Sequence, residues 1–367
     1  MENKKIALYG LGKKTKAILE QYRNYNIVAL LDRNRTGEIE WNLPIVSVKE
    51  AQQMGVTAII IAASSVNTPV IFRRIADECE QYHISVYDMT GRKMEKKTGP
   101  FVLDSFYETC TEARLTELIR KSDVISFDIF DTLLVRDVLF PSDIFEMVEE
   151  ASKEVLPREI NFAKYRIQCE QEKNLVGEPK LSDIYGELMI KTGLSQDTTN
   201  RLMTAEIEEE KHRLHAREKM LSLAREANAA GKIICCTSDM YLSQNVLSEI
   251  LVREGYDFLS QIFISCEYGS SKANGLYSAV RKEYPKAKIL HIGDNRDADI
   301  IAANKFGIDA TFQIPSIYKM ISDSTAYGIL DQEMTLEDRI HYGTLFAREF
   351  NDPFLFERTK GIYECQK

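Results

Sequence analysis

The chain has 367 residues, of which 44% are hydrophobic and 28% are charged, and its 47 basic and 56 acidic residues give a net charge of −9. This length predicts two domains or more, because single hydrophobic cores stop growing at about 250–300 residues. The acidic balance argues against nucleic acid as a partner, since non-specific binding to DNA or RNA requires a basic surface.

The sequence also argues against a membrane or secreted protein. No apolar run approaches the about 18 residues of a membrane-spanning helix, and the apolar run near the N-terminus is too short for a signal peptide. The seven cysteines show no paired metal-site spacing, a pattern that suits buried or free thiols in the cytoplasm. Cys235 and Cys236 are neighbours on a predicted strand, so we expect their side chains to point to opposite faces.

Short apolar runs alternate with helical patterns over the first hundred residues. Strands are predicted at 5–10, 27–32, 57–64 and 84–89, and helices at 13–25, 47–55 and 68–82. Repeated strand–helix units indicate a parallel sheet covered by helices, which predicts a Rossmann-like domain over residues 1–98. The polar stretch Thr90–Pro100 then predicts a linker.

A second region of strand–helix alternation is interrupted by a long helical segment. A helix is predicted at 106–123 and a strand at 124–128, whereas residues 141–231 show helical spacing and no strand signal. From residue 232 the alternation returns, with strands at 232–238, 261–265, 288–294 and 309–314 and helices at 243–255, 274–284 and 297–307. The sequence thus predicts an α/β protein whose second domain comprises residues 99–140 and 232–314, with a helical insertion at 141–231 and a helical tail at 315–367.

Polar residues follow the predicted strands of this second sheet in order. They are Asp128, Asp131 and Thr132, then Thr237, Ser238 and Asp239, then Lys272, and finally Gly293, Asp294, Asp297 and Asp299. Because the carboxyl ends of parallel strands converge on one crevice, residues far apart in the chain can meet there. A carboxylate nucleophile, a hydroxyl, an ammonium and an acidic cluster for a hard cation indicate phosphoryl chemistry.

Each residue also has an ordinary alternative. Asp128 can be a turn former at a strand end, and Lys272 a surface lysine before a helix. Ser238 can be the N-cap of the following helix, and Thr237 can serve in its place. Asp297 is the member of the acidic cluster most typical of a solvated surface.

The ordered motifs over residues 122–312 resemble the haloacid dehalogenase superfamily, most of whose members are phosphohydrolases. The resemblance implies that Asp128 attacks phosphorus to form an aspartyl-phosphate, that Ser238 and Lys272 hold the phosphoryl oxygens, and that the insertion at 141–231 is a cap. It also implies a Mg²⁺ site formed by Asp128, Asp294 and the backbone carbonyl of Phe130, with Asp299 orienting metal-bound water. The stretches "SFDIFDTLL", "SDMYL" and "HIGDN" resemble more narrowly a bacterial subgroup found with surface-polysaccharide genes.

One position departs from the pattern of the phosphatases. Phe130 stands where they carry a second aspartate that protonates the leaving oxygen, and Asp131 stands where they carry glycine. Asp131 is the nearest candidate for a replacement acid, and Asp239 the next. Dehalogenases of the superfamily also carry an aromatic residue at this position but as a rule lack a magnesium site, so "GDNRDAD" argues against dehalogenation.

The first domain carries a partial dinucleotide-binding pattern. Gly10 and Gly12 follow a strand and open a helix, and Asp32 ends the next strand, but Thr15 replaces the third glycine. The domain resembles the Rossmann-like domain at the front of bacterial sugar acetyltransferases, which holds a nucleotide sugar. A nucleotide or nucleotide-sugar site and a purely structural or interaction role remain the two leading interpretations, with redox use of a nicotinamide behind them.

The sequence therefore predicts a Mg²⁺-dependent phosphohydrolase or phosphotransferase. Its expected substrate is a small phosphorylated molecule, such as a sugar phosphate or related glycan precursor. The alternative is a non-catalytic module of a polysaccharide assembly system that binds such a ligand without turnover.

Overall fold

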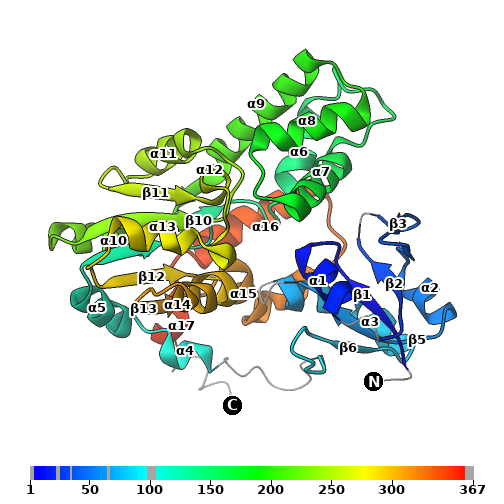
Figure 1. Cartoon of the computed structure of the whole chain (residues 1–367), viewed down its shortest axis with the longest axis horizontal. Helices are drawn as coiled ribbons and strands as arrows, with labels where there is room; N and C mark the ends of the chain where they lie inside the picture. The colour runs from blue at the N-terminus through cyan, green and yellow to red at the C-terminus, as the bar shows by residue number, and fades with distance from the viewer. Residues whose placement is uncertain (1–3, 22–24, 34, 64–66, 97–104, 360–367) are drawn as a thin grey trace. The chain divides into compact units, whose positions relative to one another are not determined.

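A computed structural model describes residues 4–21, 25–33, 35–63, 67–96 and 105–359. The chain divides into two compact units, one formed by Met1–Pro100 with Asn174–Val176 and the other by Phe101–Lys173 with Gly177–Lys367. Each unit is built on a parallel sheet with helices beside it (Figure 1), which confirms the predicted α/β class. Part of the predicted linker, residues 97–100, lies outside the described residues.

The N-terminal unit has a four-stranded parallel sheet in the order β2-β1-β5-β6. The strands are β1 (Lys5–Tyr9), β2 (Ile27–Leu31), β5 (Val56–Ile61) and β6 (Ser85–Tyr87), and the helices are α1 (Lys13–Gln21), α2 (Val48–Gln53) and α3 (Asn67–Gln81). A hairpin of β3 (Ile39–Glu40) and β4 (Leu43–Pro44) was not predicted, because two-residue strands carry no periodic signal. Its turn residues Trp41 and Asn42 both have positive φ, as in the tightest hairpin turns.

The second unit has a five-stranded parallel sheet in the order β11-β10-β7-β12-β13. The strands are β7 (Val124–Phe127), β10 (Ile233–Ser238), β11 (Gln261–Ile264), β12 (Ile289–Gly293) and β13 (Ala310–Gln313). All four residues of β7 are buried, as expected for a central strand covered on both faces. The central position of β7 places the residue that follows it, Asp128, in the middle of the carboxyl edge.

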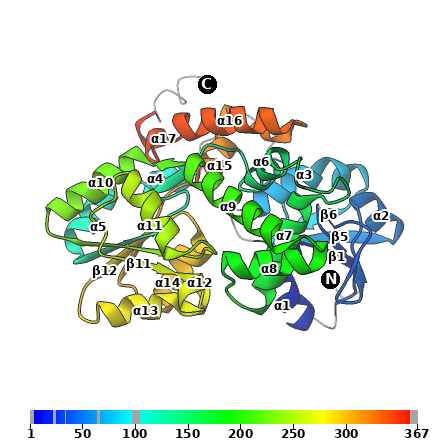
Figure 2. The same cartoon turned by 90° about the horizontal axis from the view of Figure 1, so that it is seen from above.

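Helices cover both faces of this sheet. One face packs against α5 (Glu112–Lys121), α10 (Glu218–Ala229) and α11 (Gln244–Arg253), and the other against α13 (Leu276–Glu283) and α14 (Ala302–Lys305), as Figure 2 shows. Cys236 belongs to the first of these apolar layers and Cys235 to the second. The expectation that these two side chains point to opposite faces is therefore confirmed.

The helical insertion contains α6 (Asp143–Ala151), α7 (Phe162–Val176), α8 (Leu181–Thr192) and α9 (Gln196–Arg213). A short antiparallel pair, β8 (Leu134–Arg136) and β9 (Leu214–Ala216), connects the insertion to the sheet. No strand was predicted in the region of β9, because three residues are too few to show alternation. Helix α10 packs against β10 and α5, so it covers the sheet although its sequence continues the helical pattern of the insertion.

The C-terminal tail forms α15 (Ile317–Ser322), α16 (Leu336–Glu349) and α17 (Leu355–Arg358), with a 3₁₀ segment at Thr325–Asp331. Helix α16 approaches the chain leaving β8 so closely that a Cβ atom on Gly343 would lie 2.2 Å from the carbonyl carbon of Val138. The predicted helix at 106–123 is divided into α4 (Phe106–Thr109) and α5, because Thr111 caps α5 by accepting a hydrogen bond from Arg114 N. Within the described residues, no helix is both long and apolar enough to cross a membrane.

Candidate active site

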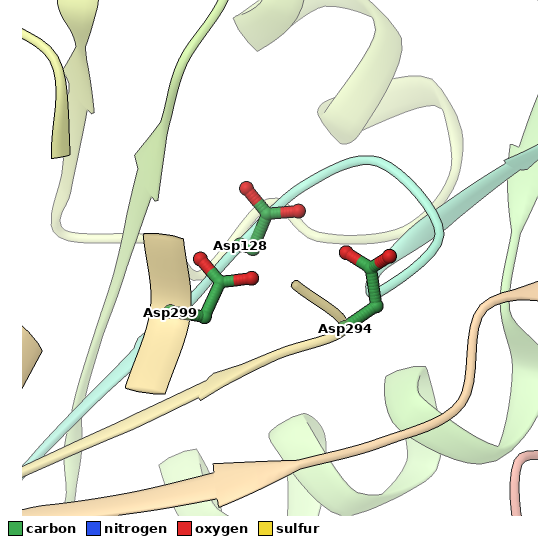
Figure 3. A group of neighbouring side chains, drawn as sticks. All are labelled: Asp128, Asp294 and Asp299. Atoms are coloured by element: carbon green, nitrogen blue, oxygen red, sulfur yellow. The ribbon is translucent and has the colours of Figure 1, made fainter. Parts of the chain in front are cut away.

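Three carboxylates meet at the carboxyl edge of β7 and β12. Phe127 pairs with Ile292, so Asp128 and Asp294 emerge from adjacent strand ends. Asp299 reaches the same point from the helical turn Arg296–Ile301. One oxygen atom from each of the three carboxylates lies within 4.8 Å of the other two (Figure 3). The predicted convergence of these residues is therefore present in the structure.

Gly293 permits this arrangement. A Cβ atom at this position would lie 2.3 Å from Cγ of Asp299, well inside van der Waals contact. The absence of a side chain lets the Asp299 carboxylate lie directly against the end of β12. Steric crowding by Asp299 therefore explains why the "GDNRDAD" motif begins with glycine.

Lys272 lies between two of the carboxylates. Its Nζ contacts Oδ1 of Asp128 and lies 2.6 Å from Oδ1 of Asp299, and only 3% of the residue is exposed. Its backbone N–H donates to Oδ1 of Asp239 at 2.8 Å, which fixes the start of the short 3₁₀ turn Lys272–Asn274. The Asp128 carboxylate contacts Lys272 through Oδ1 and also accepts from the backbone N–H of Ile129. Among the described residues, the Asp294 carboxylate makes no hydrogen bond, so it remains available to a cation.

The three carboxylates outnumber the single lysine that lies among them. Burial raises the pKa of Asp128 to about 7, although Lys272 acts in the opposite direction. Burial, then Asp131, Asp299 and Asp128, raise the pKa of Asp294 well above its usual range. Burial also opposes ionisation of Asp299, but Lys272 and His291 outweigh it and hold that pKa well below the usual value. A hard divalent cation prefers such an oxygen donor set, so the residues fit a magnesium site.

A chain of buried polar residues supports Asp299 from inside the sheet. Thr237 Oγ1 lies 2.8 Å from Ser126 Oγ, which lies 2.9 Å from His291 Nδ1. Nε2 of His291 lies 3.2 Å from Oδ1 of Asp299. Burial lowers the pKa of His291, which favours the neutral ring. A neutral ring with its proton on Nε2 can donate to Asp299 and accept from Ser126. The sequence interpretation missed Ser126 and His291.

The loop after β7 has an unusual backbone conformation. Asp131 has a φ of 55°, in the left-handed region that favours glycine and tolerates aspartate. Its Oδ1 lies 3.4 Å from the backbone N–H of Ile317, and burial raises the pKa of its carboxyl. Thr132 is fully buried, and its Oγ1 has no hydrogen-bond partner among the described residues. Phe130 is half-buried, and its ring packs against the Arg136 guanidinium.

Arg217 fastens this loop to the C-terminal tail. Its side chain has no exposed surface, and its five N–H groups point to five acceptors: the carbonyl oxygens of Asp131, Pro315, Phe350 and Asn351, and the sulfur of Met320. The Asp131 carbonyl lies 2.6 Å from Nη1. Burial lowers the pKa of Arg217 to about 10, which still leaves a cation beneath the acidic site at neutral pH. Arg217 was not among the residues predicted for the site.

The alternatives for the second strand end can be compared with the structure. Ser238 ends β10 and is buried, whereas the N-cap of α11 is Ser243, so the capping role considered for Ser238 is wrong. Thr237 is engaged with Ser126 inside the sheet. Ser238 is therefore the hydroxyl that remains at the strand end, and its contact with a phosphoryl group stays a prediction.

The helical insertion contacts the carboxyl side of the sheet. Lys180, the N-cap of α8, forms an ion pair of 2.8 Å with Glu267, which lies beyond the end of β11. The backbone N–H of Leu181 donates to the carbonyl of Tyr241 in the loop after β10. Arg136 of β8 forms a two-point ion pair with Glu210 of α9. The insertion therefore contacts loops at the carboxyl edge of the sheet, and its role as a cap stays a prediction.

The N-terminal unit brings two of its predicted site residues together. Tyr9 pairs with Leu31, so Gly10 and Asp32 stand at neighbouring strand ends. Gly10 requires glycine because its φ is 116°. Gly12 has space around it, since a Cβ atom there would meet no atom within 4 Å. Thr15, in the place of the third glycine, is buried and donates its hydroxyl to the Gly10 carbonyl at 2.8 Å.

Comparison with known proteins gave matches among solved structures. No family model matches the chain, and no curated protein matches it. One similar structure is a HAD-hydrolase, YfnB from Bacillus subtilis bound to magnesium, with 17% identity, a TM-score of 0.38, and coverage of 52% of this chain and 87% of that one. A predicted phosphoglycolate phosphatase from Haemophilus somnus has 18% identity, a TM-score of 0.34, and coverage of 54% and 91%. A 2-haloacid dehalogenase from Pseudomonas syringae has 15% identity, a TM-score of 0.38, and coverage of 52% and 85%.

Proposed function

We propose that this protein is a magnesium-dependent phosphohydrolase or phosphotransferase of the haloacid dehalogenase type. Its proposed substrate is a small phosphorylated molecule, such as a sugar phosphate or related glycan precursor. The observation that supports this function is the meeting of Asp128, Asp294 and Asp299 around Lys272 at the carboxyl edge of a parallel sheet. Ligands of open α/β sheets bind at this edge.

The residues of the site have separate proposed roles in phosphoryl transfer. Oδ2 of Asp128 is the proposed nucleophile, and Lys272 holds the opposite oxygen of the same carboxylate in place. Ser238 and Lys272 would bind the phosphoryl oxygens, as the order of the motifs implies. Asp128 and Asp294 would hold the Mg²⁺ ion, whose charge lets an anionic carboxylate approach an anionic phosphate.

Asp299 acts through its neighbours in this proposal. Its Oδ1 accepts from Lys272 and His291, and its Oδ2 accepts from the backbone N–H of Asn295 at 2.9 Å. Both oxygens are thus occupied by hydrogen bonds, so its main part is to position Lys272. The predicted role in orienting metal-bound water remains a hypothesis.

The test of the proposed function is phosphate release from a panel of phosphorylated substrates in MgCl₂ and in EDTA. We expect phosphate release in MgCl₂ and none in EDTA. We also expect millimolar MgCl₂ to raise the thermal midpoint of unfolding by mass action. Asp294→Asn should remove the rise in midpoint, while Asp257→Asn, at an exposed position, should retain it. Binding of phosphorylated ligands without phosphate release from any of them would favour the non-catalytic module.

We also infer a nucleotide or nucleotide-sugar site in the N-terminal unit, because Gly10 and Asp32 stand at neighbouring strand ends. Millimolar UDP-sugar or dinucleotide should then raise the thermal midpoint of this unit. Asp32→Asn should abolish that rise, and the exposed Asp77→Asn should retain it. If none of these ligands produces a rise, the result favours the structural or interaction role.

A further inference from the structure

The ring of Phe130, at the position of the missing acid, is covered by a cation. The guanidinium carbon of Arg136 lies 4.4 Å from the centre of the Phe130 ring. This is well within the distance at which a guanidinium is attracted to an aromatic face. Where related phosphatases carry a proton donor, this chain therefore carries an aromatic ring with an arginine against it.

Glu210 fixes the orientation of this arginine. Nε of Arg136 lies 3.0 Å from Oε2 of Glu210, and Nη2 lies 3.2 Å from Oε1. The Glu210 side chain is 1% exposed, so the carboxylate has no competing water. Two parallel hydrogen bonds hold a guanidinium in one plane. Among the described residues, Nη1 of Arg136 makes no hydrogen bond, which leaves two N–H donors for a ligand.

Arg136 also acts on the loops that border the crevice. After Glu210, its charge interacts with Tyr241, in the loop after β10, and with Asp131, in the loop after β7. Asp131 in turn interacts with Asp294. The guanidinium therefore lies close enough to the two loops that follow the central strands for its charge to act on a residue in each.

A guanidinium in this place can stabilise an anion but cannot supply a proton. Its pKa is raised further above the usual value, because Glu210 outweighs the effect of burial. Departure of an alkoxide requires protonation, whereas departure of a phosphate or another stable anion does not. The arginine therefore favours substrates whose leaving group is already an anion.

We propose that Nη1 of Arg136 binds the leaving group, and that the substrates are phosphoanhydrides, in which the departing group is itself a phosphate. This inference rests on the proposed function. Asp128 would form an oxygen–phosphorus bond as the bridging phosphorus–oxygen bond breaks, and the electron pair would remain on the departing phosphate. One water would then hydrolyse the aspartyl-phosphate, with its proton ending on the released phosphate.

Binding to the full-length protein tests this subsite without any turnover. Calorimetry in MgCl₂ should show that methylenediphosphonate binds about tenfold or more tightly than methylphosphonate, the lower end of what a charge-assisted hydrogen bond contributes. Arg136→Lys keeps a cation beside Glu210 but removes the planar set of guanidinium N–H donors. It should therefore remove most of the difference in affinity between the two phosphonates. Arg136→Met with Glu210→Met replaces both partners by apolar groups and should abolish it as well.

Arg213 provides the matched control. It also joins α9 to the chain after β8, through Asp137 at 3.4 Å, whereas the cation over the Phe130 ring is that of Arg136. If Arg136 only fastened the cap, Arg213→Met would lower the binding ratio as much as Arg136→Lys, and the proposal would be wrong. It would equally be wrong if the wild type bound both phosphonates alike or if Arg136→Lys kept the ratio.

Measurement of turnover provides a second test of the proposal. The ratio of kcat/KM for pyrophosphate to kcat/KM for p-nitrophenyl phosphate should fall about tenfold or more in Arg136→Lys. A wild type that prefers glycerol phosphate to pyrophosphate would overturn the assigned substrate class. If the wild type hydrolyses none of these compounds, the proposed function fails, and the phosphonate ratio still decides whether Arg136 binds a second anionic group.

Discussion

Replacement of Asp128 by asparagine is expected to lower the turnover of every phosphorylated substrate by about 10³-fold or more, because an amide cannot form the aspartyl-phosphate. The substitution keeps the shape of the side chain, and the residue is 6% exposed and lies directly after the central strand. The measurement is kcat for the best substrate found in the magnesium-dependent panel.

The same variant should remain folded. Asp128 belongs to a buried group in which burial and the Asp299 charge disfavour its ionised form, as the raised pKa of about 7 shows. In EDTA the removal of this carboxylate relieves like-charge repulsion, so the thermal midpoint should be at least as high as in the wild type. Loss of turnover together with a midpoint several degrees lower would indicate a structural effect instead.

A substitution of the same type elsewhere provides the control. Asp197 is exposed in the first turn of α9 and is far in sequence from the motifs. Asp197→Asn should leave turnover within a few-fold of the wild type, since exposed substitutions away from the site have small effects. Equal losses in the two variants would contradict the role given to Asp128.

The elements and the acidic site could be predicted from the sequence because burial leaves a clear pattern. Strands β7 and β12 are buried throughout, so they appear as mostly apolar runs that end just before the two carboxylates. Asp128 and Asp294 directly follow these runs. Parallel pairing of the two strands is then sufficient to bring the two carboxylates together.

The support beneath the site could not be predicted, because it depends on the order of the strands. Ser126 and His291 become neighbours only because β7 pairs with β12, and Thr237 reaches Ser126 only because β10 lies on the other side. A signal was nevertheless present. Ser126 lies two residues before Asp128, and His291 lies two residues before Gly293, so each shares a strand face with the motif residue that follows it.

The two arginines at the site were missed for a different reason. Arg217 contacts Asp131, Pro315 and Asn351, which are separated by up to 220 residues, and no periodic pattern connects them. Arg136 shares β8 with apolar residues and resembles an ordinary strand-end charge. Its partner Glu210 is one of many acidic residues in α9, and only burial distinguishes it from the others.

Glu206→Gln is expected to lower the thermal midpoint of the second unit by roughly 10 °C. Glu206 and Arg166 have no exposed surface, and their two contacts measure 2.7 and 2.6 Å. Glu206→Gln leaves the buried Arg166 with Glu170 as its one remaining carboxylate partner among the described residues, at 2.8 Å. Breaking a buried ion pair typically costs about 3–5 kcal/mol. Each kcal/mol corresponds to about 2–4 °C for a unit of this size. Calorimetry of the full-length protein measures the shift.

The surroundings of the pair explain why this effect should be large. Glu206 also accepts a hydrogen bond of 2.7 Å from the Tyr185 hydroxyl, and the Arg166 guanidinium packs against the rings of Phe145 and Tyr241. These contacts join α6, α7, α8 and α9 at a single point. Loss of the charge at Glu206 therefore disturbs the whole cap, and through Tyr241 it reaches the loop after β10.

Two further variants test whether the unpaired buried charge, rather than another cause, lowers the thermal midpoint of Glu206→Gln. The pair Lys153–Glu150 has side chains that are 65% and 63% exposed, so Glu150→Gln should change the midpoint by about 1 °C or less. Arg166→Met combined with Glu206→Met removes both charges and should recover most of the loss, because an apolar pair of similar volume carries no uncompensated charge. A double variant as unstable as Glu206→Gln would show that packing, and not the unpaired charge, decides the stability of the cap.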